Sequence, residues 1–153
     1  MRIVIAAVGR ARAGPTRELF EHYRRRIGWP VALKEVEERR PLPPDRLKRR
    51  EAELLQAAVP KGARLVALDE AGKALTSAQF ADLIGRWRDD GARDLAFVIG
   101  GAEGLDERLR GRADLILRLG RMTWPHLLVR ALLAEQLYRA QQILAGHPYH
   151  RRQ

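Results

Sequence analysis

The chain has 153 residues, a length that suits one domain with one substantial core. It carries 29 basic residues against 19 acidic ones, so its formal net charge is +10. Most of the basic residues are arginines, which favours a polyanionic partner such as a nucleic acid, although a merely basic surface would have the same composition. The absence of cysteine excludes disulfides, thiolate zinc sites and cysteine nucleophiles.

The first ten residues, MRIVIAAVGR, contain a short apolar run. A signal peptide would need a longer apolar region followed by a small-residue cleavage site. No run in the chain approaches the roughly 20 apolar residues that a helix needs to cross a bilayer. We therefore expect a first strand here, and a cytoplasmic protein without membrane contact.

Strands and helices alternate along the sequence. Continuous apolar runs, typical of parallel strands buried on both faces, occur at residues 3–8, 65–68, 95–99 and 115–117. A looser alternation predicts an outer strand at residues 31–36. Helices are expected at about residues 16–26, 45–58, 77–89, 105–110 and 125–145. This order predicts a single α/β domain over residues 1–153, with a mainly parallel sheet and helices on both faces.

Polar residues mark several of the expected boundaries. Thr16 and Asp45 are candidate caps of the first two helices, and Thr76 or Ser77 caps the third. The strand at 65–68 is expected to end at Asp69. The second helix begins with a basic segment, residues 46–50, which is either a solvated helix face or an RNA-contacting patch.

The last helix organises the rest of the chain. Pro125 suits a first helical turn, where its missing N–H costs nothing, and Gly146 suits a helix C-terminus. Apolar residues form two neighbouring lines along this helix, one through Leu133 and one through Ala131. So wide an apolar arc usually buries two faces. We expect the second face to meet a second copy of the chain; a core helix of a monomer is the alternative.

Three strand ends have features of a ligand site. They are residues 68–70, the glycine cluster GGAEG at 100–104 and the loop at 119–124. Ligands of open α/β sheets bind beyond the carboxyl ends of strands, and glycines let a ligand lie against bare backbone. The cluster lacks the spacing of a dinucleotide fingerprint, and the loop at 9–14 lacks the Lys-Ser/Thr of a phosphate-binding loop. A glycine-lined crevice is predicted, with a tight strand-to-helix turn as the alternative.

No catalytic constellation stands out among the residue types. Two of the four histidines, His147 and His150, lie near the C-terminus without the cysteine or nearby acid that a metal site would need. We expect no metal. Ser77, the only serine, is a candidate cap, which argues against a serine nucleophile.

Several segments nevertheless match a known family. They are FVIGGAEGL (97–105), MTWPH (122–126), LVR (128–130), EQLYRA (135–140) and HPYHR (147–151). Their combination, from the first strand to the C-terminus, resembles the ribosomal RNA large subunit methyltransferase H family of the SPOUT superfamily. The likeness is weakest at residues 38–60, and Trp124 stands where the family often has an aliphatic residue or Phe.

This resemblance implies an S-adenosylmethionine (SAM)-dependent enzyme. Its substrate would be N3 of a pseudouridine in the helix 69 loop of 23S rRNA, on the assembled ribosome. The resemblance also implies a homodimer and a C-terminal trefoil knot, which general folding rules would not suggest. A SPOUT methyltransferase acting on transfer RNA and a non-enzymatic RNA-binding module are the alternatives.

The family's site residues carry over by position. Cofactor contacts fall on Leu68, Gly100, Leu119, Gly120, Arg121, Met122, Thr123 and Trp124, and the backbone of the last six would hold the adenine. The candidates for the chemistry are His126, Arg130, Tyr149, His150 and Arg151. For His126 the alternative is a residue that only shapes the loop. For the tail, ordering over an active site, including that of a partner subunit, stands against a frayed chain end.

Overall fold

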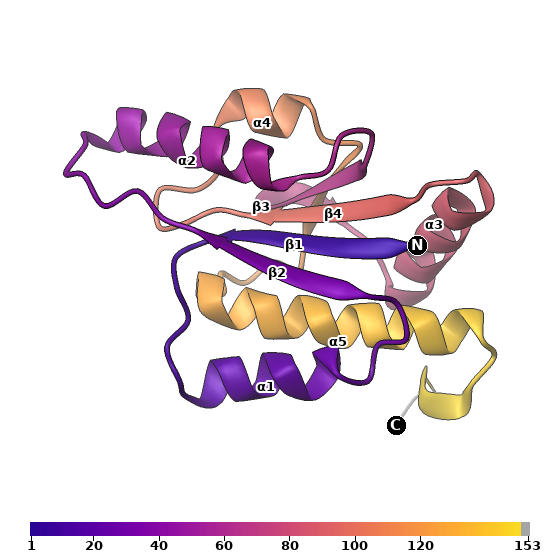
Figure 1. Cartoon of the computed structure of the whole chain (residues 1–153). Coiled ribbons are helices and arrows are strands. Elements are labelled where there is room, and N and C mark those ends of the chain that lie inside the picture. The colour runs from indigo at the N-terminus through magenta and orange to yellow at the C-terminus, as the bar shows by residue number, and fades with distance from the viewer. Residues whose placement is uncertain (151–153) are drawn as a thin grey trace.

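The chain folds around one five-stranded sheet (Figure 1). The computed structural model describes residues 1–150. All strand pairs are parallel, in the order β2-β1-β4-β3-β5. The strands are β1 (Arg2–Val8), β2 (Val31–Val36), β3 (Arg64–Ala74), β4 (Asp94–Ile99) and β5 (Leu115–Arg118). The helices are α1 (Pro15–Arg24), α2 (Pro44–Ala58), α3 (Ser77–Asp89), α4 (Glu107–Gly111), α5 (His126–Leu144) and the 3₁₀ helix η1 (Pro148–His150). The predicted α/β class is confirmed.

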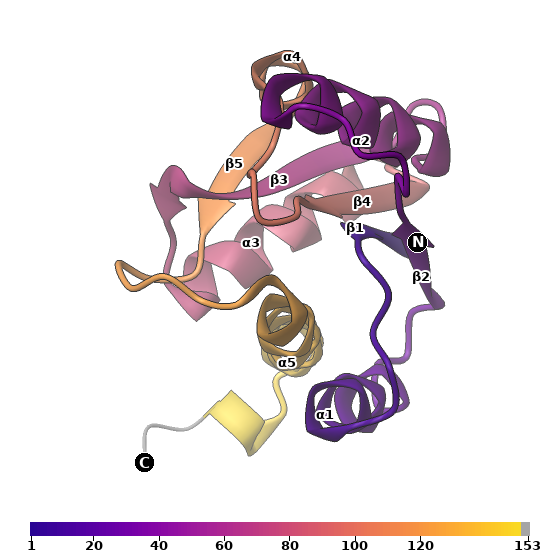
Figure 2. The ribbon, with the colours of Figure 1, turned by 90° about the vertical axis from the view of Figure 1, so that its left-hand side faces the viewer.

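Helices cover both faces of the sheet, as the sequence predicted. Along β1, Ile3 and Ile5 point into the core shared with α1, α3 and α5, whereas Val4 and Ala6 point into the core shared with α2 and α4. Figure 2 shows α2 and α4 on one side of the sheet and the other three helices opposite. Because β1 and β4 meet water on neither face, their sequences are nearly continuous apolar runs.

Helix α5 lies between α1 and α3 (Figure 2). The middle of both apolar lines is covered by the chain itself, because five residues are at most 1% exposed: Ala131, Leu133, Ala134, Leu137 and Ala140. The middle of this helix therefore does not need a second copy of the chain, and the homodimer stays a prediction. A charged residue at Leu133 would bury an unpaired charge in the monomer's own core and would not report on a dimer.

Two helix starts differ from the sequence prediction. Thr16 and Asp45, expected as caps, lie inside the first turns of α1 and α2. Each of these helices begins with a proline, whose fixed φ suits a first turn and which shifts the cap to an earlier residue. Thr76 caps α3 as predicted, in a capping box with Gln79.

Strand β3 is longer than the apolar pattern indicated. It continues past Leu68 almost to α3, with a register shift against β5 between Leu68 and Lys73. Gly72 allows β3 to return this close to β5, since a Cβ there would lie 2.6 Å from the carbonyl oxygen of Ile116. Residues 69–72 therefore form a bulge at the carboxyl edge of the sheet.

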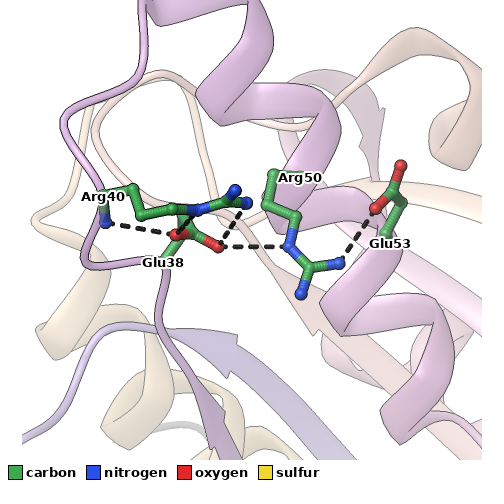
Figure 3. A network of polar contacts seen from close by, with 4 residues as sticks. All are labelled: Glu38, Arg40, Arg50 and Glu53. Atoms are coloured by element: carbon green, nitrogen blue, oxygen red, sulfur yellow. Dashed lines mark hydrogen bonds and ion pairs between the residues drawn. The ribbon is translucent and has the colours of Figure 1, made fainter.

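Ion pairs hold the connection between β2 and α2 (Figure 3). Glu38 accepts hydrogen bonds from Arg40 at 2.7 Å and from Arg50 at 3.1 Å, and Arg50 also donates to Glu53 at 3.0 Å. Hydrogen bonds from Arg40, and then from Arg50, lower the pKa of Glu38 to about 2. One arginine of the basic segment 46–50 thus belongs to this connection, which reduces the charge that the segment offers to RNA.

Candidate functional site

A cavity of about 490 Å³ lies at the carboxyl edge of the sheet, and we call it the edge cavity. The ends of β3, β4 and β5 and the start of α5 form its walls. Figure 2 looks onto this edge and shows the segment that runs from β5 to the start of α5. All but one of the carried-over cofactor positions line the cavity: Leu68, Gly100, Leu119, Gly120, Met122, Thr123 and Trp124. Arg121 is exposed and does not line it.

The glycine loop after β4 shapes one wall of the edge cavity. The N–H of Gly104 donates to the carbonyl of Gly101 at 3.0 Å, and Gly104 has a φ of +79°, a region that favours glycine. A Cβ on Gly100 would lie 2.8 Å from the backbone carbonyl group of Gly104. Gly100 is therefore required for the loop to close on itself. A side chain there would strike the loop before it met a ligand.

The loop before α5 forms another wall. The indole N–H of Trp124 donates to the carbonyl of Leu119 at 3.0 Å, which closes the loop on itself. Trp124 is 40% exposed and Met122 is 75% exposed, so both side chains stand at the surface. An aliphatic residue at position 124 could not form the hydrogen bond to Leu119. This bond explains why a tryptophan suits the position.

His126 is the first residue of α5 and lines the edge cavity. Its ring lies near the loop after β1, because a Cβ on Gly9 would be 3.5 Å from Nε2. Partial burial, and then the positive charge of Arg130, lower the pKa of His126. The imidazole is therefore neutral at neutral pH and can accept a proton.

Arg130 does not line the edge cavity. It is 1% exposed, and its guanidinium donates to Glu35 at 2.6 Å and to the carbonyl oxygens of Val8 and Gly9 at 3.2 and 2.8 Å. Sequence reasoning did not identify Glu35, because nothing in an alternating edge strand distinguishes this acid from its neighbours. Only the contact with a residue 95 positions away reveals it.

The tail packs against α5. The hydroxyl of Tyr149 donates to Glu135 at 3.2 Å, its ring meets that of Tyr138 edge to face, and the guanidinium of Arg139 lies 4.9 Å from the ring centroid. Burial, and then the negative charge of Glu135, raise the pKa of Tyr149. Residues 148–150 thus form a short 3₁₀ helix that packs on α5.

These tail residues lie outside the edge cavity of their own chain. Tyr149 lines a second cavity of about 510 Å³, which Trp124 also borders. The ring of His150 contacts Arg139 at 3.1 Å. Neither Tyr149 nor His150 lines the edge cavity, and Arg151 lies outside the described residues.

The edge cavity is acidic, although the chain is basic. Asp69, Glu70 and Glu103 line it, with Arg118 as the one arginine among the lining residues of the described chain. Asp69 lies 3.6 Å from Arg110, which offsets part of this charge. Such a lining suits a small cationic molecule better than a phosphate.

A further acid lies behind the glycine loop. Glu51 on α2 is 8% exposed, and its Oε1 has no hydrogen-bond partner among residues 1–150. Its other oxygen would lie 3.3 Å from a Cβ on Gly101. Burial, and then the negative charge of Glu103, raise the pKa of Glu51.

A parallel α/β sheet with a small-molecule cavity at its carboxyl edge defines a ligand-binding class. Within residues 1–150 no group of three potential metal ligands occurs, and no helix is long and apolar enough to cross a membrane. The family described as Predicted SPOUT methyltransferase matches residues 1–150. The chain belongs to this family.

Its relatives match over their whole length. A protein of Rhodospirillum centenum is 66% identical over 151 residues, and one of Dinoroseobacter shibae is 50% identical over 159 residues. Each alignment covers 99% of both chains, and both relatives are named ribosomal RNA large subunit methyltransferase H.

Solved structures share the fold at low sequence identity. A methylase family protein of Haemophilus influenzae has a TM-score of 0.57 at 8% identity, over 98% of this chain and 70% of that one. A Legionella pneumophila methyltransferase with bound SAM has a TM-score of 0.50 at 15% identity, over 92% and 66%. At these identities the likeness shows the fold alone.

Proposed function

We propose that this chain is a SAM-dependent methyltransferase of large-subunit ribosomal RNA. The observation that carries the proposal is the edge cavity, where the carried-over cofactor positions come together from three strand ends. Full-length relatives that are named as ribosomal RNA large subunit methyltransferases support the same substrate class. The net charge of +10 supports a polyanionic partner.

The residues of the edge cavity fit SAM. Its volume of about 490 Å³ lies in the range of small-molecule sites. Leu68, Leu117 and Val129 offer apolar walls for an adenine, and the backbone of residues 119–124 offers hydrogen-bonding groups. The acidic lining favours a ligand with a sulfonium and an ammonium group. When bound, SAM supplies a methyl group on a positively charged sulfur.

His126 is the base in this proposal. Transfer forms a bond between N3 of the target and the methyl carbon while the sulfur–carbon bond breaks, and the N3 proton must leave. A neutral imidazole on the cavity wall can accept that proton. Most of the acceleration comes from holding the two reactants in line and away from water.

The target that the family resemblance implies is N3 of a pseudouridine in the helix 69 loop of 23S rRNA, on the assembled ribosome in the cytoplasm. Support comes from the segments at 97–105, 122–126 and 147–151, which match the family in order. The alternatives are a transfer RNA target and an RNA-binding module without activity. A module gives no reason for an acidic cavity in a basic chain.

The active form is proposed to be a homodimer of single domains, each covering residues 1–153 and containing a C-terminal trefoil knot. The family resemblance implies the homodimer and the knot. The surface of the second cavity supports the dimer. Leu19, Trp124 and Tyr149 line it and are 36–40% exposed. Sedimentation should give a dimer at micromolar concentration, and Leu19→Glu should give a folded monomer. A wild-type monomer under these conditions would refute the dimer.

We propose that the tail acts in RNA contact, at the edge cavity of the partner subunit. Its basic and aromatic residues suit phosphates and an extruded base. Deleting residues 148–153 should leave SAM affinity unchanged, because the walls of the edge cavity are formed within one chain without Pro148, Tyr149 or His150, and should abolish methyl transfer. Transfer at the wild-type rate by the truncated protein would contradict this role.

Two assays test the proposed function. Calorimetry with SAM separates an enzyme from a binding module, since the module has no reason to bind the cofactor. Incubation with tritiated SAM and ribosomes from a strain that lacks the enzyme should label the large-subunit RNA. Label in transfer RNA with none in ribosomes would favour the alternative enzyme.

A further inference from the structure

Arg130 is a buried arginine that binds the end of a strand. Its Nη2 donates to the carbonyl oxygens of Val8 and Gly9 at 3.2 and 2.8 Å, and its Nη1 donates to Glu35 at 2.6 Å. The same Glu35 oxygen accepts the N–H of Ala11 at 2.6 Å. These contacts join α5, β2 and the loop after β1 at one point.

Stability alone is a weak reason for this arrangement. Burying an arginine and a carboxylate costs desolvation energy, and apolar residues of similar volume are often as stable or more so. The Nε–H of Arg130 is also buried without a hydrogen-bond partner among the described residues. A buried arginine that costs desolvation energy is better explained by a role in positioning the residues around it.

The ion pair lies next to His126. One helical turn separates His126 from Arg130, so both side chains lie on the same side of α5. Gly9 lies close to both, because a Cβ there would be 3.5 Å from Nε2 of His126 and 4.0 Å from Nη2 of Arg130. His126 also lines the edge cavity, so this cluster connects the end of β1 to the cavity wall.

We propose that Arg130 and Glu35 are positioning residues, which hold the end of β1 against the first turn of α5 and thereby fix the place and the charge of His126. The inference rests on the proposed function, in which His126 accepts the N3 proton. Because Arg130 does not line the edge cavity, it acts through His126 and is not itself a catalytic group.

The two charges of the pair act on His126 in opposite directions. Arg130 disfavours the imidazolium, and Glu35 partly cancels that effect because it neutralises Arg130. Other charged residues near this cluster are Arg10 and Arg12 after β1 and Arg121 before α5. Asp69, Glu70, Glu103 and Arg118 line the edge cavity with His126, and Arg17, Glu21 and Arg24 line another cavity with Arg130 and Glu35. Neutralising Arg130 should therefore raise the pKa of His126, whereas neutralising Glu35 should lower it. If the pair only stabilised the fold, the two substitutions would not shift the pKa of His126 in opposite directions.

NMR titration of the His126 ring in full-length protein tests the proposal. The signal is assigned by its loss in His126→Asn and followed in Arg130→Gln and Glu35→Gln. We expect an upward shift of the pKa in the first variant and a downward shift in the second.

The control variant is Glu135→Gln, which breaks the 2.6 Å pair with Arg139 on the same helix and should leave the titration of His126 unchanged. If Arg130→Gln does not fold, Glu35→Gln decides, because Glu35 is only partly buried. No shift in that variant, or shifts of one sign in both, would overturn the proposal.

A pH profile of kcat adds the functional readout. Activity needs neutral His126, so the acidic limb should move to higher pH in Arg130→Gln and to lower pH in Glu35→Gln. The misplaced base should lower kcat by about a hundredfold, with SAM affinity unchanged. An unchanged kcat and profile in both variants would overturn the positioning role. The titration needs no ribosomes, so its outcome stands even if the wild-type protein methylates nothing. Full activity of His126→Asn would instead refute His126 as the base.

Discussion

Two glycine-bearing loops leave neighbouring strands at the same edge of the sheet, and they serve different purposes. The first loop, residues 9–14, follows β1, and the second, residues 100–104, follows β4; Ala7 and Ile99 are paired at the ends of these strands. The first carries two arginines and the second carries Glu103. Only the second lines the edge cavity.

The backbone contacts of the two loops explain the difference. At the first loop, Arg130 binds the carbonyls of Val8 and Gly9, and Glu35 binds the N–H of Ala11. The second loop closes through its own bond between Gly104 and Gly101, and its residues line the edge cavity. Glycine content alone therefore does not identify a ligand site. A glycine loop whose backbone groups are already bound by side chains, as in the first loop, has fewer of them available for a ligand.

The largest expected effect comes from breaking the second loop. Gly100→Val forces a side chain within 2.8 Å of the Gly104 backbone, so the loop must open. SAM binding should fall by at least about tenfold, or roughly 1.4 kcal/mol. Thermal stability should also fall. Gly14→Ala in the first loop is the matched control, since a Cβ there has nothing within 4 Å. Calorimetry that gives both variants the wild-type affinity would place the cofactor elsewhere.

A second prediction concerns stability and the acid behind the second loop. The pKa of Glu51 is higher in the folded protein than in the unfolded chain. Ionisation of this carboxyl therefore lowers the free energy of unfolding. This loss begins as the pH rises above the unfolded-state pKa and is complete above the folded-state pKa. Glu51→Gln should raise the free energy of unfolding by about 1 kcal/mol at pH 8. The gain should be much smaller near pH 4, where the carboxyl is mostly protonated in both states. Urea unfolding at the two pH values measures it, and an equal effect at both would contradict the assignment.

A smaller effect is expected from the charge of the second loop. Glu103→Gln should weaken SAM binding about twofold to fivefold, the range of a partly exposed charge interaction. Its affinity for S-adenosylhomocysteine should change less, because this product lacks the sulfonium charge. Calorimetry with both ligands distinguishes a charge effect from a change of shape, which would weaken both equally.

The smallest effect is expected from one arginine of the first loop. Arg12→Gln should lower ribosome affinity slightly and reduce the slope of log affinity against log salt by about one, as loss of one phosphate contact does. SAM affinity should stay the same. Arg88→Gln on α3, which removes an arginine paired with Asp89, serves as the control. Equal salt slopes for Arg12→Gln and the wild type would show that Arg12 makes no phosphate contact.

Apolar patterning predicted the element order of this chain well, because β1 and β4 are buried on both faces and the helices repeat their apolar residues with the helical period. It failed at β3, where Asp69 and Glu70 interrupt the apolar run, yet the strand returns to β5 through the close approach at Gly72. It also did not decide what packs on the second apolar face of α5, because a wide apolar arc does not distinguish a second chain from α1 and α3 of the same chain.

The site was predicted in part. The glycine loop and the loop before α5 have local signals, and the family resemblance assigned them a cofactor. The buried state of Arg130 had no such signal, because its partners lie on β1 and β2, far away in the sequence. The tail's packing on α5 through Tyr138 and Tyr149 was not expected either, because a short polar segment has no apolar period.

Mass mapping of 23S rRNA tests the central claim most directly. Ribosomes from a strain that lacks the enzyme are incubated with SAM and either the wild-type protein or Gly100→Val, and RNA fragments are weighed. We predict one added methyl group on a pseudouridine of the helix 69 loop with the wild-type protein, and a much smaller yield at limiting SAM with the variant. No added methyl group in 23S rRNA, with a wild-type protein that binds SAM, would contradict the account.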